Sequence, residues 1–194
     1  MLTTGVDTFV GTDKNELITG TTSTLVAKNT LNQQDVIDGG EGSDIFKLNM
    51  ESNNSAFTDG SIKNVEKIEL TNDTVITRTF DAKNVTGATE YNINSAKGVN
   101  LTNLESTGIK VSQEGTQSNT SITYVSTLDL TGSTDAATLA FKDVGAAKTD
   151  SSTGVNQKTT LAKIEVVTVE SNGTANFVDL SALSDSTTLV AKGA

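Results

Sequence analysis

The residues best suited to chemistry lie in a glycine-rich segment, residues 39–47, which reads GGEGSDIFK. Its first, second and fourth positions are glycines, which allow positive φ angles and can turn backbone carbonyl oxygens inward. Asp44 adds a carboxylate, and Phe46 provides an apolar residue for a short strand. Carbonyl and carboxylate oxygens are the ligands that calcium prefers. The segment therefore predicts a calcium-binding turn followed by a strand.

The same pattern recurs with a period of nine residues through the first part of the chain. The interval between the second and third clear copies is one residue longer than two periods, which indicates a degenerate copy with an insertion between residues 20 and 29. The sequence thus predicts five half-turns in phase, each a turn plus a strand. The acidic and apolar positions of the four clear copies are Asp7 and Phe9, Glu16 and Ile18, Asp35 and Ile37, and Asp44 and Phe46.

The period also predicts how the turns stack. If successive strands lie on opposite walls, turns two copies apart stack at the inter-strand spacing of about 4.7–4.9 Å. This scheme makes the Glu16 and Asp35 turns neighbours that share a calcium ion, and it places the Asp7 and Asp44 turns on the other edge with the degenerate turn between them. The candidate metal ligands are Asp7, Asp13, Glu16, Asp35, Asp38, Gly40, Gly42 and Asp44.

Composition excludes several classes of function. The chain contains no histidine and no cysteine, which removes histidine-based triads, cysteine nucleophiles and the usual zinc sites. The net charge is −10 and Arg78 is the only arginine, so a footprint for nucleic acid is missing. No window of about 18 apolar residues is available for a membrane span. We therefore expect calcium as the metal and no catalytic activity.

The remainder of the chain, residues 59–194, continues in short alternating runs separated by Asn, Asp, Gly, Ser and Thr. Alternation of apolar and polar residues is typical of strands with one buried face. We expect an all-β fold, a right-handed parallel β-solenoid, with a calcium-binding β-roll at residues 1–58 and wider irregular coils continuing from it. A β-roll followed by a Greek-key β-sandwich is the alternative. The expected strands include residues 67–70, 91–93, 99–101, 109–111, 122–124, 128–130, 139–141, 164–166 and 189–191.

Residues 35–44, DVIDGGEGSD, preceded by residues 4–12, TGVDTFVGT, resemble the RTX-type surface-layer proteins of Gram-negative bacteria such as Caulobacter and Campylobacter. The strong motif covers residues 2–47 only. The resemblance implies type I secretion, an extracellular location and calcium-dependent assembly with copies of itself. It also implies lipopolysaccharide contacts through regions outside this chain. The start of the chain lacks an ordinary signal peptide, as expected of an excised piece or of export through a C-terminal signal.

In such proteins the turn carbonyls and the Asp at the sixth position hold calcium. These positions correspond to Gly40, Gly42 and Asp44 here, and to Asp35 and Asp7 in the weaker copies. Glu16 replaces that Asp and Lys14 replaces a glycine, which weakens the expected second site.

Three functions remain open at this point. The first is a structural lattice module of a surface layer, favoured by the calcium repeats and by the missing catalytic residue types. The second is an RTX adhesin segment that binds glycan or a host surface, although few aromatic residues are available for sugar stacking. The third, which we rank lowest, is the β-roll tail of a secreted protease or lipase.

Overall fold

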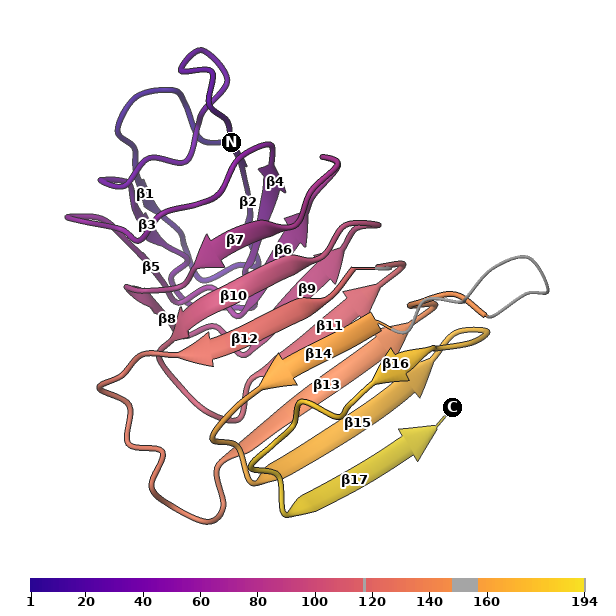
Figure 1. Ribbon diagram of the computed structural model, residues 1–194. Coiled ribbons are helices and arrows are strands. Elements are labelled where there is room, and N and C mark those ends of the chain that lie inside the picture. The colour runs from indigo at the N-terminus through magenta and orange to yellow at the C-terminus, as the bar shows by residue number, and fades with distance from the viewer. Residues whose placement is uncertain (117, 148–156, 194) are drawn as a thin grey trace.

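The computed structural model describes residues 1–116, 118–147 and 157–193 and contains strands and turns. Within these residues there is no helix, and hence none that could cross a membrane. The strands form three sheets in which every described pairing is parallel (Figure 1). This architecture is consistent with a parallel β-solenoid or roll. A Greek-key sandwich needs antiparallel strands, so that alternative is wrong for the described residues.

The longest sheet has eight strands and runs the length of the molecule. Because β4 pairs with β6, it crosses the expected boundary at residue 58 without interruption. Its strands, in spatial order, are β2 (Leu17–Thr22), β4 (Ile45–Met50), β6 (Lys67–Thr71), β9 (Glu90–Asn94), β11 (Lys110–Glu114), β13 (Ala136–Lys142), β15 (Val166–Asn172) and β17 (Thr188–Gly193).

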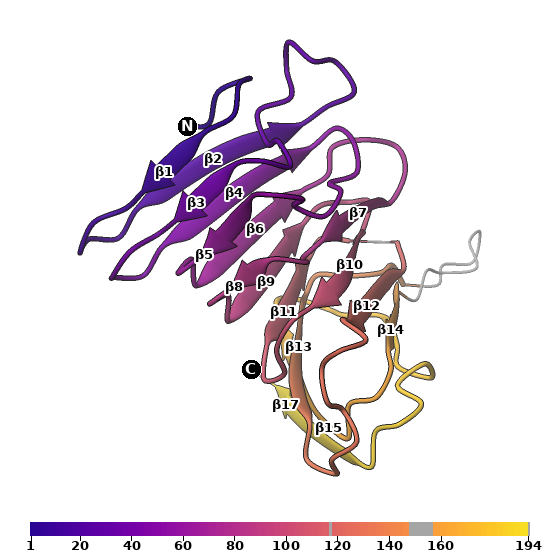
Figure 2. The same cartoon turned by 90° about the vertical axis from the view of Figure 1, so that its left-hand side faces the viewer.

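Two shorter sheets complete the circuit of the chain. The four-stranded sheet faces the N-terminal strands of the long sheet, as Figure 2 shows, and the five-stranded sheet faces its C-terminal part. One circuit, here called a coil, contributes one strand to the eight-stranded sheet. The four-stranded sheet contains β1 (Thr8–Val10), β3 (Val36–Asp38), β5 (Ser61–Lys63) and β8 (Val85–Thr86). The five-stranded sheet contains β7 (Arg78–Asp81), β10 (Val99–Leu104), β12 (Thr120–Tyr124), β14 (Gln157–Leu161) and β16 (Val178–Asp179).

The alternation expected of half-buried strands sets which side chains form the core. In β4, Phe46, Leu48 and Met50 are buried, whereas Lys47 is exposed and Asn49 is half-buried. The parallel register repeats this arrangement from coil to coil, so inward residues stack into columns. One column consists of Ile18, Phe46, Ile68, Tyr91, Val111 and Leu139, each at most 2% exposed.

Two of the expected strands do not form as predicted. Residues 128–130 lie in a loop, where the Asp129 carboxylate accepts hydrogen bonds from the backbone N–H and the hydroxyl of Thr131. Such a local turn competes with pairing in a sheet. The run at residues 164–166 is mostly a turn as well, because β15 begins only at Val166. Alternation over three residues was therefore too short a signal at both places.

A closed ring of polar side chains joins opposite walls in the interior. The Gln157 amide donates to Gln113 Oε1 at 2.8 Å, Gln113 Nε2 donates to Thr159 Oγ1 at 3.1 Å, and Thr159 Oγ1 donates to Gln157 Oε1 at 3.1 Å. All three residues are at most 1% exposed. Each partner satisfies another, which is what makes buried amides tolerable in an apolar core.

We therefore predict that Gln157→Leu destabilises the fold. The substitution leaves the buried polar groups of Gln113 and Thr159 without a hydrogen-bond partner, which should lower the free energy of unfolding by about 1–3 kcal/mol. Urea denaturation followed by circular dichroism measures this change. The exposed neighbour Thr160 is the control, because Thr160→Ala should shift stability by no more than about 0.5 kcal/mol. Equal effects of the two substitutions would show that the ring contributes nothing.

Candidate calcium-binding turns

Two long turns connect the four-stranded sheet to the eight-stranded sheet at the N-terminal end. Residues 11–16 link β1 to β2, and residues 39–44 link β3 to β4. The turns stack directly, since the flanking strands pair in register and the Glu41 N–H donates to the Thr12 carbonyl at 2.8 Å. In the next coil the corresponding turn is reduced to residues 64–66. The turns that carry the repeat motif are thus those of the first two coils.

The stacking partners differ from those expected from the nine-residue period. Asp7 lies beside Asp35, and Glu16 lies beside Asp44, each pair 28 residues apart. The Glu16 and Asp35 turns are therefore not neighbours that could share a calcium ion, and the placement of the Asp7 and Asp44 turns on one edge was also wrong. The reason is that residues 23–35 form an irregular connection that closes the circuit, so one coil contains three nine-residue units and the inserted residue.

The glycines of the second turn are required by its backbone. Gly40 and Gly42 have φ angles of 90° and 116°, in the region that favours glycine. A Cβ atom at Gly40 would lie 2.4 Å from the Thr12 carbonyl oxygen, and one at Gly42 would lie 2.5 Å from that of Lys14. The Gly40 N–H donates to Asp38 Oδ1 at 3.1 Å. Close stacking of the turns therefore accounts for these glycines even without a bound metal.

Asp44 is a candidate ligand whose carboxylate has one buried oxygen without a hydrogen-bond partner. Its Oδ1 accepts the Glu16 N–H at 2.7 Å, and its own N–H donates to Glu66 Oε2 at 2.7 Å. The residue is 1% exposed, and its Oδ2 is buried without a hydrogen-bond partner. Burial raises the pKa of this carboxyl group, and the negative charges of Glu16 and Glu66 raise it further. A buried carboxylate in this setting needs a proton or a cation.

Asp35 has the same position in the repeat but different surroundings. Its Oδ1 accepts the Asp7 N–H at 2.9 Å, and its Oδ2 accepts the Asn32 N–H at 2.7 Å. The side chain is fully buried, and this burial raises the pKa of its carboxyl group. The backbone hydrogen bonds from Asn32 and Asp7 lower the pKa, but burial has the larger effect. Both oxygens are thus occupied by backbone donors, and Asp35 acts as a clamp between coils.

The remaining acidic candidates lie nearer the surface. Glu16 accepts the Thr12 N–H at 3.2 Å and the Thr12 hydroxyl at 2.5 Å, and the hydroxyl contact is the main cause of its lowered pKa. Asp7 accepts the N–H and hydroxyl of Thr3 at 2.7 and 2.9 Å. Asp13 is exposed. Across the described chain, no three acidic side chains are placed to hold a metal on their own, so a cation here would depend on backbone carbonyls as well.

The structure adds residues that the repeat did not indicate. Glu66, which lies outside the repeat, accepts the Asp44 N–H. The arrangement recurs in the C-terminal half, where Glu165 Oε2 accepts the Asp135 N–H at 3.2 Å and Asp135 Oδ2 is buried without a partner. Both glutamates directly precede a strand of the eight-stranded sheet. An acidic residue just before an alternating run is the signal that could have identified them.

No protein family, curated protein or solved structure matches this chain. The geometry of its own residues must therefore carry any functional interpretation.

We predict that Asp44→Asn separates metal binding from folding. The amide keeps an acceptor for the Glu16 N–H but removes the buried charge. Without calcium, the variant should be at least as stable as the wild type, and the rise in Tm on adding calcium should be lost. Calorimetry with calcium and with a chelator measures both quantities.

Asp35→Asn is the matched control for that experiment. An amide N–H₂ at this position must face one of two backbone N–H donors, which should cost about 1–3 kcal/mol with or without calcium. The calcium response itself should survive. Loss of the response in the Asp35 variant, with retention in the Asp44 variant, would contradict the assignment.

The raised pKa of Asp44 also predicts a pH dependence. A carboxyl group whose pKa is higher in the folded than in the unfolded state destabilises the fold when ionised. In the absence of calcium, wild-type stability should therefore rise relative to Asp44→Asn as the pH falls through the raised pKa toward the ordinary value of 3.8. Urea denaturation of both proteins along a pH series measures this difference. A difference that is constant with pH would show that Asp44 titrates normally.

Proposed function

We propose that this chain is a structural module of a secreted surface-layer protein that assembles with copies of itself when calcium is present. The observation that carries the proposal is the buried Asp44 Oδ2, which has no partner and lies in a turn with glycines at positive φ. The proposed fold is a right-handed parallel β-solenoid whose first two coils have the character of a β-roll.

Calcium fits the chemistry of the donors at this turn. The ligands we propose are Asp44 and the carbonyl groups of Gly40 and Gly42, with Glu16 and Glu66 adding negative charge nearby. Bound calcium would supply positive charge that neutralises the buried carboxylate. Because the unfolded turn cannot preorganise these oxygens, binding would stabilise the folded coils by mass action. Asp35 lies before β3, at the opposite end of that strand from this turn, and joins the first two coils through the Asp7 N–H.

A structural role accounts for the remaining features of the chain. Parallel strands stacked in register form a long, continuous ladder of backbone hydrogen bonds with charged and polar side chains on its surface. Such a body can separate or connect other parts of an assembly at fixed distances. The sequence contains no histidine and no cysteine, which removes histidine-based triads and cysteine nucleophiles.

The test is assembly of the full-length protein in calcium and in chelator. We expect ordered sheets by negative-stain electron microscopy in calcium and dispersed protein after chelation, with Asp44→Asn impaired and Thr160→Ala unaffected. Protein that stays dispersed under both conditions would exclude the lattice role. Ordered sheets that form equally well in calcium and in chelator would support the lattice role but contradict the calcium dependence of assembly.

A further inference from the structure

The outer face of the eight-stranded sheet carries a groove across β2, β4, β6, β9 and β11, with a volume of about 620 Å³. Its walls are mainly outward side chains of these strands, which the register aligns in two columns, together with Asp73 from the loop after β6. One column contains Thr19, Lys47, Glu69 and Asn92. In the other, Asn49 pairs with Thr71 and Asn94 pairs with Glu114. The groove is therefore polar, and its lining repeats at the inter-strand spacing of about 4.8 Å.

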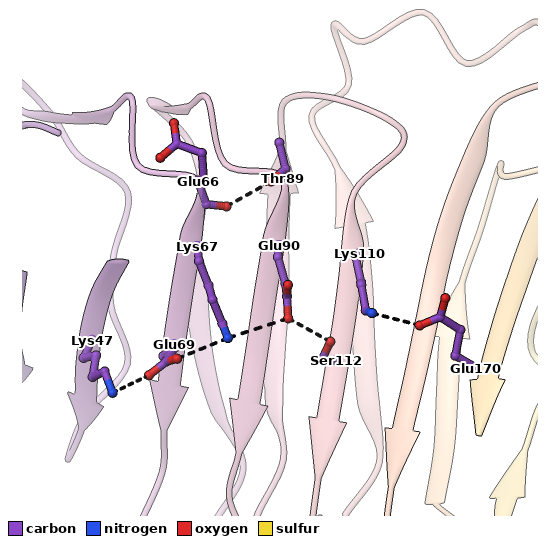
Figure 3. Close-up of polar contacts among 9 residues, drawn as sticks. All are labelled: Lys47, Glu66, Lys67, Glu69, Thr89, Glu90, Lys110, Ser112 and Glu170. Carbon is purple, nitrogen blue, oxygen red and sulfur yellow. Dashed lines mark hydrogen bonds and ion pairs between the residues drawn. The ribbon is translucent and has the colours of Figure 1, made fainter. Parts of the chain in front are cut away.

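The charged residues along this face largely neutralise one another. Lys47 lies 2.8 Å from Glu69, which Lys67 also approaches at 3.3 Å, and Lys67 lies 3.9 Å from Glu90 (Figure 3). Glu114, at the far end of the groove, pairs with Lys142 at 2.6 Å. Since the cation in the groove already has a partner, an anionic ligand would have to break an ion pair to bind.

The neutral side chains, in contrast, have no partners of their own. No hydrogen bond within the described chain engages the side chains of Thr19, Asn49, Thr71, Asn92 or Asn94. The side-chain amide oxygens (Oδ1) of Asn49 and Asn92 are also buried without a hydrogen-bond donor. A buried acceptor that lacks a donor costs free energy, and rotation of the amide would present that oxygen to the groove. These neutral amides and hydroxyls line the groove beside Asp73, an exposed carboxylate in the loop after β6, so the groove offers neutral hydrogen-bonding groups and repels anions.

We propose that this groove binds a neutral, hydroxyl-rich oligosaccharide that lies along the stacking axis of the sheet. Sugar hydroxyl groups both donate and accept, as the asparagine amides and threonine hydroxyls require. The volume lies within the range of about 300–1,000 Å³ that is usual for ligand sites. The site is independent of the calcium turns, because none of its side chains belongs to residues 11–16 or 39–44.

The chemistry of the groove also sets the expected strength of binding. No aromatic ring lines it, so stacking against a sugar face contributes nothing. We expect weak binding at each site, which becomes effective when many copies engage one polymer. Such a site suits a protein presented in a repeated array.

Affinity electrophoresis of the purified chain tests the proposal. The gels contain dextran or yeast mannan as neutral polymers, polygalacturonate as an anionic polymer, or chitosan as a cationic one. We expect at least one neutral polymer to retard the protein. The double variant Asn49→Leu/Asn92→Leu should need about tenfold more polymer for the same retardation, from the loss of two amide contacts.

Thr71→Val is a second, milder variant, which should weaken binding without disturbing the fold. Thr168→Val, on the outer face of β15 and outside the groove, is the matched control and should behave as wild type. Circular dichroism establishes that each variant is folded. Retardation by neither neutral polymer, by the charged polymers only, or to the same extent in the double variant would each overturn the proposal. Calcium-dependent assembly would be unaffected by any of these results, so the two proposals fail separately.

Discussion

Parallel stacking imposes one requirement on every coil of this protein. Each buried backbone N–H must find an acceptor, including at the corners, where the ladder of a sheet ends and the carbonyl groups of the adjacent coil turn away. In six places in the described chain, a carboxylate from the following coil supplies that acceptor. The donor–acceptor pairs are Asp7 with Asp35, Glu16 with Asp44, Asp44 with Glu66, Asn84 with Glu105, Asp135 with Glu165, and Lys163 with Asp185.

This requirement explains why acidic residues are poor indicators of metal ligands in such a chain. Asp35 and Asp44 occupy the same position in the repeat, and both are buried. Only their second oxygens differ, because that of Asp35 accepts the Asn32 N–H and that of Asp44 has no donor. A repeat motif can therefore predict which carboxylates accept a backbone N–H from the adjacent coil. Whether such a carboxylate also needs a cation depends on the environment of its second oxygen atom.

The sequence allowed the strand chemistry to be predicted but not the length of the coil. The apolar position of the repeat points inward as expected, since Ile18, Ile37 and Phe46 are at most 1% exposed. The nine-residue phase is compatible with two or three units per circuit, and the choice depends on how the intervening loop closes. Here it closes through contacts such as the Thr30 hydroxyl with the Thr21 N–H, which no local pattern indicates. The grooved outer face was unpredictable for the same reason, because it depends on register.

The eight-stranded ladder also has a mechanical consequence. Its hydrogen bonds run along the stacking axis, so tension applied along that axis passes through every interface between coils in series. Failure then begins at the interface with the fewest bonds. Between the third and fourth coils, β5 and β8 pair over only two residues, and β6 and β9 pair over only four. Tension along the axis should therefore first open this interface, which lies between the coils that carry the candidate calcium-binding turns and the C-terminal coils.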